Sequence, residues 1–141
     1  MNKYSSEEEI ETLVRSFEEA SVPRDEWKHA EHLVVALYYV SHHDIVTAAL
    51  KMRNGILNLL RNGFGVDLTK GMPYHETVTL FWIRVIAKFN ASKNGASLSE
   101  RVAEMIGKFD KDYPLKFYTR ERLFSEDARA VFTEPDIKQF D

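Results

Sequence analysis

Three histidines carry the strongest chemical signal in this sequence. His29 and His32 are three positions apart, and residues at that spacing lie on one helix face with Cβ atoms roughly 5–6 Å apart. His75 precedes Val78 and Trp82 at helical spacing, which places it on the inward stripe of a later helix. Imidazoles from two helices suit a divalent transition metal such as Zn, Fe, Mn or Ni. The sequence therefore predicts metal ligands at His29, His32 and His75.

Carboxylates near these histidines could complete such a site. Glu76 directly follows His75 and is the candidate for a fourth ligand, or for the catalytic general base of a metal-dependent hydrolase or transferase. Glu31 is another candidate, and Asp110 and Asp112 would reach the same end if the preceding helix returns there. An open coordination position would make the site catalytic, whereas a fourth protein ligand would make it structural.

Each of these residues also has a purely structural interpretation. A His-x-x-His pair is a weak signal, because buried histidines often only hydrogen-bond a carboxylate or a backbone carbonyl. His75 could simply begin a helix, and Glu76 could be a first-turn acid that the helix dipole favours. His42 and His43 lie roughly 15 Å from His32 along a helix axis, so we expect them in an exposed connection.

Apolar residues recur at helical spacing through most of the chain. They predict a helix after Ser6, a second over about 23–41, a third from Asp44 to Asn62, a fourth starting near His75 and a fifth from Ser97 along to Phe109. The second is apolar on every side from Leu33 to Val40, which predicts a buried central helix. Residues 63–74 form a long loop, and a short helical stretch near 125–132 precedes a tail that packs on the bundle.

The predicted fold is therefore all-α: one domain over residues 1–141, a four- to five-helix up-down bundle. Short connections favour antiparallel neighbours, so the second and fourth helices should run parallel. Their N-termini would then meet at one end of the bundle, and this topology would bring the three histidines together.

Composition excludes several classes of protein. The 19 basic and 22 acidic residues give a net charge of −3 without a basic block, which argues against nucleic-acid binding. The absence of cysteine excludes disulfides, thiol catalysis and cysteine-ligated metal centres. The longest apolar run, from Leu33 to Val40, is too short to span a membrane, and the N-terminus lacks a signal-peptide pattern. We therefore expect a cytoplasmic protein with no membrane partner.

Two metal-free functions remain open from the residues alone. One is an interaction module that acts through an apolar surface, with a homodimer as one form. The other is a small-molecule binder whose aromatic pocket would be lined by Trp27, Tyr38, Tyr39 and Tyr74. The segment 116–122 could bind an anionic ligand through its arginines, although the interleaved acids favour intramolecular ion pairs.

Two motifs also support a resemblance. Trp27-Lys-His29-Ala-Glu-His32 and Tyr74-His75-Glu76-Thr77-Val-Thr79 together resemble the signature of an uncharacterised bacterial family of all-helical proteins, over most of the chain. The resemblance implies a bacterial origin and a shared site, but no activity. A looser likeness, in size, helical content and the three-histidine arrangement, is to the DinB-like metal-binding bundles.

Overall fold

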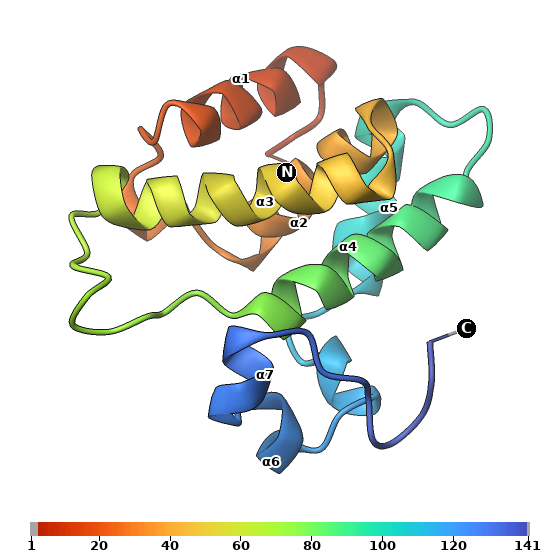
Figure 1. The fold of residues 1–141 in the computed structure, drawn as a ribbon. Coiled ribbons are helices and arrows are strands. Elements are labelled where there is room, and N and C mark those ends of the chain that lie inside the picture. The colour runs from red at the N-terminus through yellow and green to blue at the C-terminus, as the bar shows by residue number, and fades with distance from the viewer. Residues whose placement is uncertain (1–2, 141) are drawn as a thin grey trace.

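The fold is organised around one central helix, α2 (His29–His42), in the computed structural model, which describes residues 3–140 (Figure 1). Residues Leu33 to Leu37 of α2 are completely buried, as expected for a helix without a polar face. Four helices pack against α2, namely α1 (Glu7–Glu18), α3 (Ile45–Asn58), α4 (Glu76–Ala91) and α5 (Leu98–Lys108). The described residues contain no strand, and none of their helices could cross a membrane. The predicted all-α class and the predicted central helix are confirmed.

The two helices that carry the histidines run in the same direction. Ser41, near the end of α2, donates a hydrogen bond to Asn90, near the end of α4, across 3.4 Å. At the other end of α2, the ring of His29 packs against Trp82, with centroids 5.2 Å apart. The predicted parallel arrangement is therefore confirmed. However, the first turn of α2 lies beside the middle of α4 and not beside its start.

The predicted helix over 23–41 begins later than its sequence pattern indicates. Residues Arg24–Glu26 form one short turn, η1, and α2 starts only at His29. Between them the backbone of Trp27 is extended, and its indole stacks on Phe17 of α1 with centroids 5.0 Å apart. This tertiary contact overrides local helix propensity, which is a weak preference.

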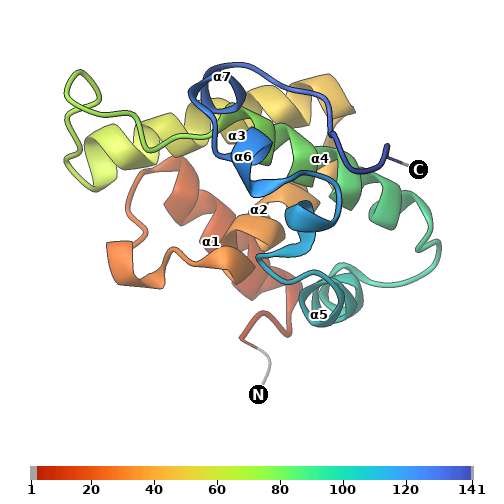
Figure 2. The same cartoon turned by 90° about the horizontal axis from the view of Figure 1, so that it is seen from below.

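The chain after α5 covers one end of α4 (Figures 1 and 2). It contains η3 (Tyr113–Lys116), α6 (Arg120–Leu123) and α7 (Glu126–Ala130). The short predicted helix near 125–132 corresponds to α7, whereas α6 was not predicted because four residues are too few to show a period. The tail is held where Thr119 donates to Asp136 through its N–H and hydroxyl, at 2.8 and 2.7 Å. The prediction of a packed tail is thus confirmed.

The remaining connection is the long loop before α4. The π-helical turn η2 (Leu59–Gly63) ends the third helix, and the loop that follows extends away from the helices before it returns to α4 (Figure 1). The prediction of a long loop between the third and fourth helices is confirmed.

Gly55 allows α1 and α3 to approach closely, so we expect the Gly55→Ala variant to be less stable. A Cβ atom at Gly55 would lie 2.2 Å from Cε2 of the buried Phe17. Alanine usually stabilises a helix by about 1 kcal/mol over glycine, but overpacking costs about 1–3 kcal/mol. We expect a net loss of about 1 kcal/mol in the free energy of unfolding, measured by denaturant titration.

Gly107→Ala on α5 is the matched control. No atom lies within 4 Å of the Cβ added there, so this variant should gain up to about 1 kcal/mol. Equal stabilisation of both variants would contradict the close packing of α1 on α3.

Candidate functional site

Both ring nitrogens of His75 are hydrogen-bonded to the backbone. Nδ1 accepts the N–H of Val78 at 3.2 Å and so caps α4, while Nε2 donates to the carbonyl of Leu123 in α6 at 2.6 Å. Burial lowers the pKa of His75, so the ring is neutral at pH 7. A ring with both nitrogens engaged offers none to a metal ion. His75 therefore has the structural role of a helix cap that also attaches α6 to α4.

His29 and His32 are held apart from His75. His29 Nε2 donates to the carbonyl of Phe109 at 3.0 Å, and its ring packs on Trp82. Trp82 is seven residues after His75, which is about 10 Å along the axis of α4. His32 instead stacks on Trp27, with centroids 5.8 Å apart.

No metal centre forms from the three predicted ligands in this structure. Across residues 3–140, no group of three or more histidine, aspartate or glutamate side chains is arranged to hold a metal ion. His29 and His75 both hydrogen-bond backbone carbonyls, and the Nε2 atom of His32 is enclosed. The nitrogen atoms of these histidines, as placed here, do not fit a shared metal ion.

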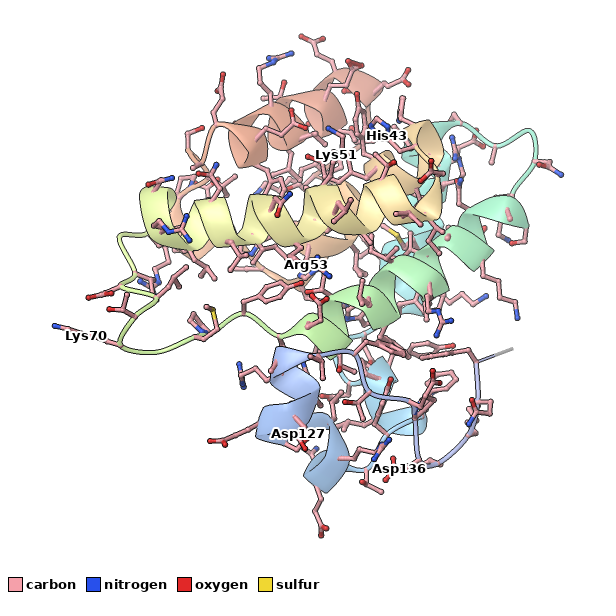
Figure 3. All side chains as sticks on the ribbon, viewed as in Figure 1. His43, Lys51, Arg53, Lys70, Asp127 and Asp136 are labelled. Carbon is pink, nitrogen blue, oxygen red and sulfur yellow. The ribbon has the colours of Figure 1, made fainter. Side chains whose placement is uncertain are left out.

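Glu76 is the acceptor in an ion pair and not a free base. Nε of Arg53 donates to its Oε1 at 3.0 Å, a terminal nitrogen of the same guanidinium pairs with Oε2, and the Tyr74 hydroxyl donates to Oε1 at 2.5 Å. Arg53 lies between α3 and the first turn of α4 (Figure 3). Burial raises the pKa of Glu76, but the hydrogen bonds from Arg53 and Tyr74 outweigh burial and leave the pKa below its usual value. Such a carboxylate is a poor proton acceptor.

The other candidate carboxylates serve other parts of the fold. Glu31 is buried, accepts the Tyr4 hydroxyl at 2.5 Å and accepts the Lys28 N–H at 3.1 Å as part of a capping box. Asp110 and Asp112 are exposed in the turn after α5. The structure therefore places none of these carboxylates in a shared site with the histidines.

The predicted aromatic residues near the histidines also have structural contacts. The hydroxyl of Tyr39 donates to Glu18 at 2.7 Å, and Tyr38 stacks on His42 with centroids 4.1 Å apart. Trp27 and Tyr74 have the contacts described above. These side chains are accounted for by hydrogen bonds and core packing.

The segment 74–79 attaches the C-terminal part of the chain to α4. Besides the bond from His75 to Leu123, the buried hydroxyl of Thr77 donates to the carbonyl of Ala128 at 2.6 Å and accepts the N–H of Thr133 at 3.1 Å. The motif that suggests catalysis in the sequence therefore positions α6, α7 and the tail.

A groove that the sequence did not indicate lies beside α4. A hollow of about 700 Å³ lies between α4, the end of α5 and the C-terminal segment. Its floor is aromatic, made by Phe89, Phe109, Tyr113, Phe117 and Phe140. The spacing of 109, 113 and 117 was visible in the sequence, but aromatic residues at helical spacing ordinarily indicate core. Only the path of the tail shows that they line a groove.

Three cationic side chains line this groove, which we call the basic groove, and none of its lining residues within 3–140 is a carboxylate. The cations are Arg84, Lys88 and Lys108, all exposed. The ammonium of Lys108 is 5.4 Å from the ring centroid of Phe109, and the guanidinium of Arg84 is 5.0 Å from that of Phe140. These cation–π contacts hold positive charge over the aromatic floor. The local charge is thus opposite to the net charge of −3 of the whole chain.

Comparison with known proteins adds no assignment. No family model matches the chain, and searches of curated proteins and of solved structures found no match. The resemblance to a bacterial helical family and to DinB-like bundles therefore stays a prediction.

Proposed function

We propose that this protein binds a small organic anion with an apolar body in the basic groove, without a metal. The observation that carries the proposal is the combination of Arg84, Lys88 and Lys108 with an aromatic floor, in a groove whose described lining residues include no carboxylate. Small-molecule binding was one of the functions left open by the sequence. The proposed site is the basic groove and not the predicted aromatic pocket near the histidines.

The chemistry of the groove favours an amphipathic anion over a neutral or cationic ligand. A hollow of this size is within the range of small-molecule sites, about 300–1,000 Å³. The aromatic rings offer apolar area to the body of the ligand. The three cations attract a carboxylate, sulfonate or phosphate group, and their attraction is screened by salt.

Isothermal titration with 1-naphthoate tests the proposal. We expect saturable binding that weakens at high ionic strength, and much weaker binding of the cation 1-naphthylmethylammonium. Lys108→Glu should reduce the affinity for naphthoate about tenfold, because it replaces an attractive charge with a repulsive one, a change of about 1.4 kcal/mol.

Lys70→Glu provides the matched control. Lys70 is exposed in the loop before α4 (Figure 3), and its substitution changes the net charge by the same amount as Lys108→Glu. It should bind naphthoate as the wild type does. Equal affinity for the naphthyl anion and cation, or equal losses in the two variants, would contradict the basic groove as the site.

Metal binding is a separate prediction with its own measurement. Elemental analysis of protein purified without a histidine tag should find less than about 0.1 equivalent of Zn, Fe, Mn or Ni, because His29 and His75 hydrogen-bond backbone carbonyls. A stoichiometric metal that is lost in a His32→Ala variant would contradict them and support the three-histidine centre.

A further inference from the structure

We propose that the ligand of the basic groove is a single-chain alkyl carboxylate, whose chain lies along the outer face of α3. This inference rests on the proposed function and names the ligand class. The α3 groove, a second hollow of about 420 Å³, is lined on α3 by Ile45, Val46, Ala49 and Leu50. Leu80 and Ile83 of α4 form its opposite wall, and Arg53, Arg84, Phe132 and Glu134 complete its lining.

The two hollows are adjacent. Ile45 and Arg84 line both of them, so a ligand that places its carboxylate on the guanidinium of Arg84 has an apolar path beside it. The path follows α3 from Ile45 to Arg53, eight residues or about 12 Å of helix. At its far end Arg53 already pairs with Glu76, which leaves Arg84 as the cation placed for the ligand.

Three apolar side chains of α3 are exposed on this face. Val46 is 67% exposed, Leu50 46% and Ile45 45%, and the three share one stretch of the helix. Contiguous exposed apolar side chains mark a binding surface more often than isolated ones do. A flexible aliphatic chain fits a shallow aliphatic groove. Only the carboxylate end of such a ligand needs a cation beside it, and Arg84 lies at that end.

Chain length is the property that tests this assignment. Complete burial of a methylene contributes about 0.8 kcal/mol, or about fourfold in affinity. The α3 groove is open, so we expect about twofold for each methylene and hence about fourfold tighter binding of decanoate than of octanoate. Titrations should use both acids as monomers, with decyltrimethylammonium as the cationic control.

Variants on α3 separate this inference from the proposed function. Val46→Thr/Leu50→Gln changes exposed side chains and should remove most of the gain from octanoate to decanoate. Its affinity for 1-naphthoate should stay at the wild-type value, since that ligand occupies the basic groove. Val131→Thr, at a valine that is 61% exposed elsewhere, should bind both acids as the wild type does.

Several outcomes would overturn the inference. Equal affinities for octanoate and decanoate, with naphthoate binding intact, would exclude an alkyl chain in the α3 groove but leave the proposed function. Binding only to vesicles of anionic lipid would assign the surface to a membrane. A stable dimer in light scattering that Val46→Thr/Leu50→Gln dissociates would assign the α3 groove to a second copy of the chain. Loss of all anion binding would end both proposals.

Discussion

Replacing Arg53 with methionine is expected to destabilise the protein by about 3–5 kcal/mol, because the substitution leaves the buried carboxylate of Glu76 without its cation. Tyr74 would still donate one hydrogen bond to Glu76, but no positive charge would remain against it. The measurement is denaturant unfolding at pH 7. The loss should shrink toward acid pH, where protonation of Glu76 removes the unpaired charge.

A double variant distinguishes the unpaired charge from lost packing. In Arg53→Met/Glu76→Leu both charges are gone, and apolar replacement of an ion pair is often neutral in stability. We expect this variant to regain most of the loss. Arg61→Met, at an exposed arginine in η2, should change stability by less than about 0.5 kcal/mol. Additive effects of the two substitutions would contradict the ion pair.

Acidification is expected to destabilise the wild type through His32. The Nε2 atom of His32 is buried without a hydrogen-bond partner, and burial, followed by the charge of His29, lowers the pKa of His32 from 6.5 to about 4. Between these values the unfolded chain binds a proton that the native protein does not. The stability that depends on neutral His32 is therefore complete above about pH 6.5 and is lost as the pH falls to about 4. The full difference corresponds to about 3 kcal/mol.

The His32→Leu variant isolates this contribution, because leucine cannot titrate and leaves no buried nitrogen without a partner. We expect its free energy of unfolding to fall less than that of the wild type between neutral pH and about pH 4. Replacing the exposed His43 (Figure 3) with leucine serves as the control and should retain the wild-type pH slope. Parallel pH profiles of wild type and His32→Leu would show that His32 is not buried as a neutral ring.

Local signals in the sequence predicted the helices well. The Ser97–Glu100 capping box begins α5, Ser6 caps α1 and Asp44 caps α3, each through a side-chain oxygen that accepts a backbone N–H. These caps act within one turn, so the sequence contains them completely. The buried centre of α2 was predictable for the same reason, because a run without polar residues leaves no face for water.

The candidate site depended on distances that no local pattern contains. The parallel direction of α2 and α4 was predictable. The position of α2 along the axis of α4 was not, because it depends on the packing of His29 against Trp82 and on the hydrogen bond from His29 to the carbonyl of Phe109. That position separates His29 from His75. The partner of Glu76 is likewise on another helix, at Arg53, where neighbouring positions in the sequence give no indication of it.

The most direct test of the account is an NMR titration with decanoate that maps shifts of the backbone amides. We predict that the largest shifts fall on Arg84, Lys88 and Lys108 around the basic groove, and on Val46 and Leu50 along α3. Amides of the loop around Lys70 should hardly move. Shifts confined to that loop, or no saturable shifts at all, would contradict the claim that this protein binds organic anions between α4 and its C-terminal segment.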